Sequence, residues 1–120
     1  MKQKVHSVSY LAKAEFTFMN GVYDLVALPS GAEVVKVSLE VVGTPKSGDI
    51  SVGFKDETQK NYFLDNIAIT PSLKVATSAK DYTATSNKVV VAEVKNANGD
   101  DIKGVLRVLY FLPSVIEVEY

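Results

Sequence analysis

The side chains that most often act as nucleophiles, bases or metal ligands are scarce in this sequence. The chain has no cysteine and one histidine, His6, which lies near the N-terminus. Acyl transfer by serine or cysteine needs a base held beside the nucleophile, and a structural zinc site needs several Cys or His ligands. We therefore predict no catalytic residue, no metal site and no cofactor, and we expect His6 on an ordinary edge strand.

The acidic residues suggest two other kinds of site. Asp56-Glu57 and Asp100-Asp101 are adjacent pairs, but neither has the ligand spacing of a calcium-binding loop. A pair of carboxylates for glycoside hydrolysis leaves no mark in a sequence, so that alternative stays open. Because 14 acidic side chains are scattered along the chain, we interpret them as solvated carboxylates of turns and outer strand faces.

Aromatic residues could form a flat platform for a sugar. The chain has no Trp, and most of its six Tyr and five Phe fall at alternating positions that are typical of a core. Tyr23, Tyr62 and Tyr82 are the candidates for an exposed platform. A core or interface role for these tyrosines is the preferred interpretation.

Charge does not select a partner. Thirteen basic and 14 acidic side chains give a net charge of -1, so no overall field attracts nucleic acid or an anionic membrane. Lys55, Lys60 and Lys74 are dispersed among acids, whereas single-stranded nucleic acid requires basic and aromatic residues on one face. No apolar run approaches the roughly 20 residues of a membrane helix, and no signal peptide is evident. We predict no nucleic-acid partner, no membrane partner and assembly in a reducing cytosol.

Alternating apolar and polar residues dominate the chain and predict strands. Val35, Val37, Leu39 and Val41 fall on one face of the clearest strand. Further inward positions are predicted at Ile50, Val52 and Phe54, and then at Tyr62-Phe63-Leu64, Ile67 and Ile69. Gly53 and Gly104 lie inside strands, which indicates a bulge or a close backbone approach.

Two turns predict hairpins. Asn20-Gly21 joins an alternating segment, 10–18, to the segment 22–26. The polar cluster 96–101 likewise joins 88–95 to 103–112, which is apolar on both faces except at Arg107 and is therefore expected to be a central strand. The sequence contains about nine or ten such strands and no helical period, which predicts an all-β, antiparallel β-sandwich of jelly-roll type. A chain of this length fits one domain, 1–120.

Both ends of the chain have strand character. After Pro113, residues Ile116, Val118 and Tyr120 alternate with Glu117 and Glu119. A terminal strand can complete the sheets of its own chain or add to the edge of a neighbour, and both alternatives are open. We predict interaction arms at residues 1–9 and 113–120, with these contact residues: Val5, Val8, Tyr10, Val115, Ile116, Val118 and Tyr120.

The order of several short motifs resembles a known family. The motifs are LPSGA at 28–32 with the valine-rich strand after it, SVGF at 51–54, YFL at 62–64, YTA at 82–84 and GVLRVLY at 104–110. Over residues 28–110 the chain resembles small structural proteins of tailed-phage virions, namely capsid decoration (cement) proteins and head–tail accessory proteins. These are turn and strand motifs, so the resemblance concerns fold and packing and names no reaction.

The resemblance implies a non-enzymatic virion component that binds other virion proteins. We expect a capsid decoration protein, made in the cytoplasm of the bacterial host. It would form a homotrimer, sit on the outer surface of the capsid and bind the major capsid protein. The alternative is a receptor- or glycan-binding module of a tail or fibre, which would require Tyr23, Tyr62 and Tyr82 to converge on an exposed face.

Overall fold

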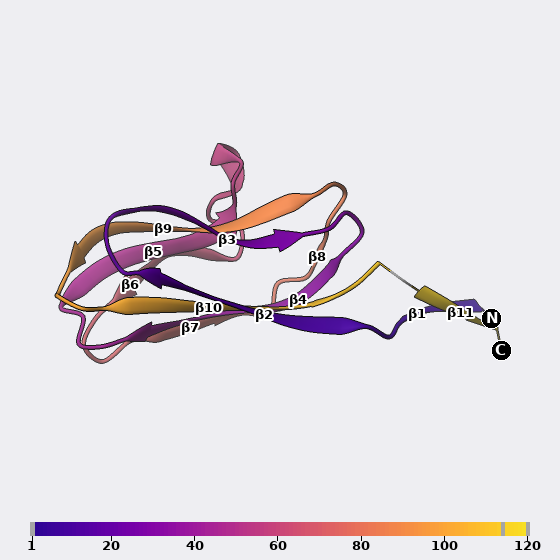
Figure 1. Ribbon diagram of the computed structural model, residues 1–120, viewed down its shortest axis with the longest axis horizontal. Coiled ribbons are helices and arrows are strands. Elements are labelled where there is room, and N and C mark those ends of the chain that lie inside the picture. The colour runs from indigo at the N-terminus through magenta and orange to yellow at the C-terminus, as the bar shows by residue number, and fades with distance from the viewer. Residues whose placement is uncertain (1, 114, 120) are drawn as a thin grey trace.

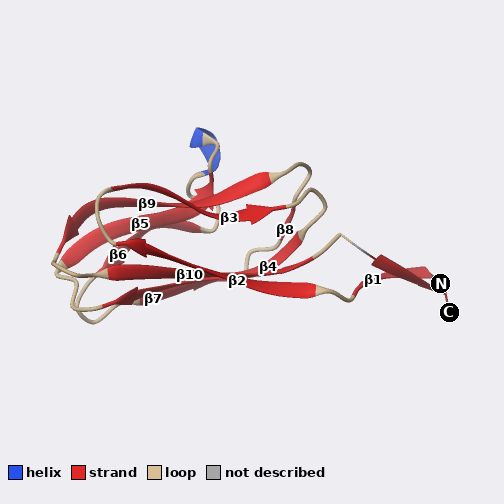
Figure 2. Ribbon diagram, in the orientation of Figure 1, coloured by secondary structure: helices blue, strands red, loops and turns tan. Residues whose placement is uncertain are grey.

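The structure of the protein is a computed structural model that describes residues 2–113 and 115–119, most of them in strands (Figure 2). One short 3-10 helix, η1 (Glu57–Gln59), interrupts the strands. The strands are β1 (Lys2–His6), β2 (Ser9–Thr17), β3 (Gly21–Leu28), β4 (Glu33–Val42), β5 (Ser47–Phe54), β6 (Leu64–Ile69), β7 (Val75–Ser78), β8 (Tyr82–Thr83), β9 (Lys88–Asn98), β10 (Lys103–Phe111) and β11 (Val115–Glu119). No helix among the described residues is long and apolar enough to cross a membrane.

Two antiparallel sheets face each other (Figure 1). One has the strand order β2-β10-β4-β7, with β8 also paired to β4, and the other has the order β3-β9-β5-β6. A separate sheet consists of β1 and β11. The predicted all-β antiparallel sandwich is confirmed.

The strand pairs show how the chain is wound. Leaving aside β1, β11 and the short β8, the first strand of the sandwich pairs with the last, β2 with β10, and the second with the one before the last, β3 with β9. In the same way β4 pairs with β7 and β5 with β6. The chain thus forms one long antiparallel hairpin that is rolled up. The additional pairs β10–β4 and β9–β5 join the rolled strand pairs into two sheets. The topology is that of a jelly roll, as predicted.

Both predicted hairpins are wrong. The strands joined by Asn20-Gly21, β2 and β3, lie in different sheets, and so do β9 and β10. In the rolled hairpin, the β2–β3 and β9–β10 connections pass from one sheet to the other. The strands that they join are therefore neighbours in sequence but do not pair. Asn20 Oδ1 accepts a hydrogen bond from the Ala97 amide (2.8 Å), which fastens the connection to β9.

The core lies between the two sheets. Val37, Leu39, Ile50 and Val52 are fully buried, in agreement with the alternation of the sequence. The prediction for Val35 is wrong, since Val34 is the buried residue at the start of β4. The register of β4 against β10 shifts between Leu109 and Tyr110, and this irregularity changes which residue faces inward.

The strand β10 is central, as its apolar sequence predicts, and lies between β2 and β4. A side chain at Gly104 would enter the space filled by the ring of Phe16. A side chain at Gly53 would likewise meet the backbone of residues 59–62. Gly53 therefore allows the close backbone approach that the sequence predicted, whereas Gly104 makes room for a side-chain ring.

Candidate interaction surface

β1 and β11 form a two-stranded terminal ribbon beyond one end of the sandwich (Figure 1). They pair antiparallel, with Lys2 opposite Glu119 and His6 opposite Val115. Within residues 2–113 and 115–119, neither strand pairs with a third one. The strands of the two predicted arms, 2–6 and 115–119, therefore meet in one projection of a molecule that is 55 Å long and 26 Å by 18 Å across.

The ribbon continues the pairing of β2 with β10. The Leu112 amide donates a hydrogen bond to Val8 O (2.8 Å) between the two sheets. The Nδ1 of His6 lies 2.9 Å from Leu112 O, and a proton on Nδ1 completes this hydrogen bond. Tyr10 packs edge-on against Tyr110, with ring centroids 5.9 Å apart. His6 thus lies on an edge strand, as predicted, and helps to join ribbon and sandwich.

Three of the predicted contact residues are exposed. The exposed fractions are 39% for Val5, 40% for Val8 and 52% for Tyr10. The backbone of Val115, Ile116 and Val118 lies in β11. Tyr120 lies outside the described residues.

The outer face of the five-stranded sheet adds exposed apolar residues that the sequence analysis did not identify. Leu11, 62% exposed, lies opposite Leu109 in the β2–β10 pair, and Val75 on β7 is 55% exposed. Between them, Arg107 Nη1 lies 3.1 Å from Glu40 Oε1. The alternation of β2 was a usable signal for Leu11, because it puts this leucine on the face opposite to Phe16. Leu11, Lys36, Ser38, Arg107 and Leu109 line a shallow hollow of about 250 Å³ on this face.

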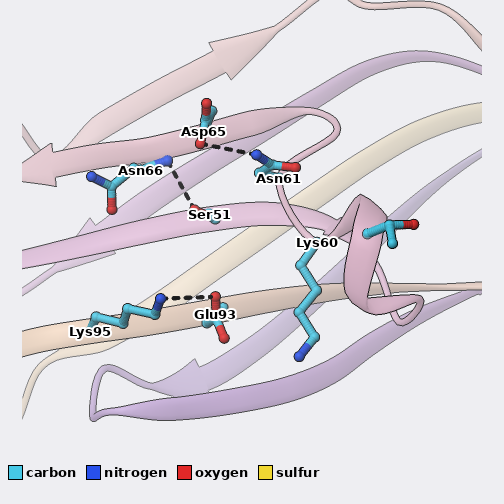
Figure 3. A pocket seen from close by; sticks show the side chains of 8 residues that line it. Ser51, Lys60, Asn61, Asp65, Asn66, Glu93 and Lys95 are labelled. Atoms are coloured by element: carbon cyan, nitrogen blue, oxygen red, sulfur yellow. Dashed lines mark hydrogen bonds and ion pairs between the residues drawn. The ribbon is translucent and has the colours of Figure 1, made fainter.

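A wider polar hollow of about 640 Å³ lies on the four-stranded sheet beside η1 (Figure 3). Its walls come from β5, β6, β9 and the segment around η1 (Figure 3). Most of its polar groups are already engaged with one another. Asn61 Nδ2 donates to Asp65 Oδ1 (3.2 Å), the Asn66 amide donates to Ser51 Oγ (2.9 Å), and Lys95 Nζ lies 3.7 Å from Glu93 Oε1. The lining residues are Ser51, Thr58, Lys60, Asn61, Asp65, Asn66, Glu93 and Lys95.

The polar hollow contains two acidic residues. Asp65 lies on β6 and Glu93 on β9, with β5 between them. Asp65 accepts the hydrogen bond from Asn61 and Glu93 lies beside Lys95, so each carboxylate has a partner of its own. No histidine or cysteine is among the lining residues.

One adjacent acidic pair, Asp56-Glu57, lies at the start of η1, and the other, Asp100-Asp101, lies between β9 and β10. Asp56 Oδ1 accepts hydrogen bonds from the amide and the hydroxyl of Thr58, each 3.0 Å long. These two bonds, together with the charge of Lys88, lower the pKa of Asp56. Asp56 thereby caps η1, and Asp101 adopts a left-handed backbone with φ of 54° before β10. In the part of the chain that the structure describes, no three His, Cys, Asp or Glu side chains gather as metal ligands.

The three candidate tyrosines do not form one exposed platform. Tyr62 and Tyr82 pack on each other (5.3 Å between centroids) and on the core residue Phe54. Tyr23 packs instead on Phe16 (5.2 Å), and its hydroxyl donates to Met19 O (2.7 Å). All three rings are half-buried, so they contribute to packing at the edge of the core.

Comparisons with known proteins place the chain among phage capsid structures. A chain in the acidic stable capsid structure of Helicobacter pylori bacteriophage KHP30 is 74% identical over 100% of both chains, with a TM-score of 0.88. A chain of the cyanophage Pam1 capsid asymmetric unit is 22% identical over 88% of this chain and 85% of that one, with a TM-score of 0.67, and supports the fold alone.

No family model and no curated protein matches the chain. The assignment therefore comes from the full-length identity with the KHP30 chain and agrees with the motif order of the sequence. The chain belongs to the family of phage virion structural proteins that includes this chain of the KHP30 capsid.

Proposed function

We propose that this protein is a capsid decoration, or cement, protein that binds the major capsid protein on the outer surface of the shell. It is a homotrimer and has no enzymatic role. The observation that carries the proposal is the 74% identity, over the full length, with a chain of the KHP30 capsid structure. A protein that binds the assembled shell but not its separated subunits stabilises the shell by mass action.

The surface of the molecule supports a role in holding neighbours together. Open strand edges and exposed apolar side chains are features that protein contacts use. The terminal ribbon and the start of β2 beside it have both, since Val5 in β1 and Val8 and Tyr10 after it are exposed, and the ribbon pairs with no further described strand. The proposed contact residues are Val5, Val8, Tyr10, Val115, Ile116, Val118 and Tyr120, the last of them outside the described part of the chain.

A receptor- or glycan-binding role has less support. It requires an aromatic platform, but Tyr62 and Tyr82 pack beside Phe54 while Tyr23 packs on Phe16. The polar hollow beside η1 has no aromatic residue in its lining. The contact surfaces of the protein therefore favour a protein partner.

Counting the copies of this protein in purified virions tests the proposal. A decoration protein covers the shell, so its molar amount should be comparable to that of the major capsid protein. Quantitative mass spectrometry with isotope-labelled peptides of both proteins gives this ratio. A ratio corresponding to only a few copies per particle would contradict a decoration role and indicate a tail component.

A truncation tests the role of the arms. Removal of residues 114–120 takes away β11 and leaves β1 without its partner. We expect loss of the trimer and weaker binding to capsids that lack the protein, measured by native mass spectrometry and co-sedimentation. Thr77→Ala, at an exposed position of β7, is the matched control and should bind normally. If the truncated chain keeps its oligomer mass and its capsid binding, the arms are not the contact segments.

A further inference from the structure

The terminal ribbon lacks what normally makes a sheet stable. It has two strands, and both of its outer edges are open within the described part of the chain. A two-stranded hairpin alone is marginally stable in water, because each open edge leaves backbone N–H and C=O groups unpaired. The ribbon is therefore a sheet that further strands would complete.

The charges of the two strands differ in sign. β1 contains Lys2 and Lys4 and no acidic residue, whereas β11 contains Glu117 and Glu119 and no basic one. The register puts Lys2 opposite Glu119 and Lys4 opposite Glu117. Opposite charges on neighbouring strands stabilise a sheet, and like charges directly opposite one another destabilise it. The free edge of β1 thus favours another β11 and disfavours another β1.

The alternation of the ribbon gives it one apolar face. The register sets Val5 opposite Ile116 and Gln3 opposite Val118. Because successive positions of a strand alternate between its faces, these four positions belong to one face and the positions of the charged residues belong to the other. Val5 is 39% exposed there. Apolar positions on an isolated ribbon have no layer across from them, whereas a closed sheet would turn them inward.

From these observations we infer that three copies join their terminal ribbons into one closed sheet, in which β11 of each copy adds to β1 of the next. The occupant of the free edges is a second copy of this chain, and the contact is head-to-tail, which closes into a ring under threefold rotation. Every neighbouring pair in the ring is antiparallel, because β1 and β11 are antiparallel within each copy. The inference rests on the proposed homotrimer and names the contact that holds it.

Cross-linking between two marked copies tests this contact. The chain has no cysteine, so a single introduced thiol has no competitor. One full-length version carries Lys4→Cys, the other carries Glu117→Cys with a different tag, and the two are co-expressed. Gln3→Cys and Val118→Cys form a second pair that covers a shift in register. Thr77→Cys in both versions is the control, since this position lies on β7 of the sandwich.

The expected result of mild oxidation is a dimer band that contains one copy of each version, both in the free protein and in protein bound to capsids. A disulfide needs Cα atoms roughly 4.4 to 6.8 Å apart, so this band requires β1 of one copy beside β11 of another. Bands of two identical versions as the main product, or no band between copies in either preparation, would overturn the inference.

A charge exchange gives a second readout. Lys2→Glu with Lys4→Glu makes both strands of the ribbon acidic and should shift the native mass from trimer to monomer. Adding Glu117→Lys and Glu119→Lys restores opposite charges and should restore the trimer. If the charge-exchanged chain stays monomeric, charge pairing does not hold the ring. A trimer that binds capsids without the expected cross-link removes only this inference, whereas low copy number in virions removes the proposed function.

Discussion

The sandwich and the terminal ribbon are built from the same kind of alternating strand, but they differ in what lies across from it. In the sandwich each sheet faces the other, and residues such as Leu106 of β10 and Ile50 of β5 are fully buried. In the ribbon Val5 stays 39% exposed, and no other described strand pairs with β1 or β11.

From this difference we expect the sandwich to fold by itself, and the proposed homotrimer assigns the ribbon to contacts with neighbouring copies. Burial of apolar surface is the main favourable contribution to folding, and the sandwich obtains it within one chain. The ribbon obtains backbone hydrogen bonds from its own two strands but no apolar layer. We therefore expect changes in the sandwich to alter the free energy of unfolding, and changes in the ribbon to alter assembly.

The largest effect on unfolding is expected for Leu106→Ala. Leu106 is fully buried on the central strand β10, so the substitution removes core contacts and leaves a cavity that costs about 2 to 5 kcal/mol. Urea unfolding followed by circular dichroism measures the loss. Leu11→Ala is the matched control, because this leucine of the neighbouring strand β2 is 62% exposed and its removal should cost less than about 0.5 kcal/mol. Equal losses for the two leucines would contradict the contrast between buried and open faces.

A smaller effect is expected for Gly104→Ala. Alanine normally suits a strand better than glycine, but its methyl group would collide here with the ring of Phe16. Such overpacking costs about 1 to 3 kcal/mol in the free energy of unfolding. Gly104→Ala introduced into a Phe16→Leu variant should cost less, relative to that variant, than it costs in the unaltered protein, because the smaller leucine side chain leaves room for the methyl group. An unchanged cost in the double variant would show that the collision is not the cause.

Removal of the ribbon should change the free energy of unfolding of the sandwich less than Leu106→Ala or Gly104→Ala does. A chain without residues 2–6 and 114–120 keeps both sheets of the sandwich and its core, so we expect a loss below about 1 kcal/mol in dilute solution. The thermal midpoint of the intact protein should rise with protein concentration, because subunit association stabilises the folded state. The midpoint of the shortened chain should be independent of concentration. A concentration-dependent midpoint in the shortened chain would place the trimer contact in the sandwich instead.

The strands were predictable from the sequence, but their partners were only partly so. Alternation identified the inward residues Ile50, Val52 and Phe54, because it depends on the local geometry of one strand. The partner of β2 is β10, far along the chain, and a local turn signal such as Asn20-Gly21 carries no information about it. The burial of Val34 instead of Val35 was not predictable either, because it follows from the register of β4 against β10.

For the candidate contact residues the structure gives exposure and strand pairing, and their contact role stays a prediction. Strand character at both termini identified Val5, Val8 and Tyr10, which are exposed. The sequence left open whether the terminal strands pair within the chain, and the pairing of β1 with β11 came only from the structure. Alternation puts Leu11 on the face opposite to Phe16, but the contact residues were predicted only in and beside the terminal arms, so Leu11 was not among them.

The smallest effect is expected for Asp56→Asn, away from both the core and the ribbon. Hydrogen bonds from Thr58 lower the pKa of Asp56 in the folded protein, so the ionised carboxylate stabilises η1 above its unfolded pKa of about 3.8. This contribution is lost as the pH falls through the lowered folded pKa. Asparagine still accepts a hydrogen bond but carries no charge, so the variant should melt slightly below the unaltered protein near neutral pH and at the same temperature near about pH 2. Differential scanning calorimetry at both pH values measures this. A difference in melting temperature that persists in acid would mean that the charge of Asp56 is not what stabilises the cap.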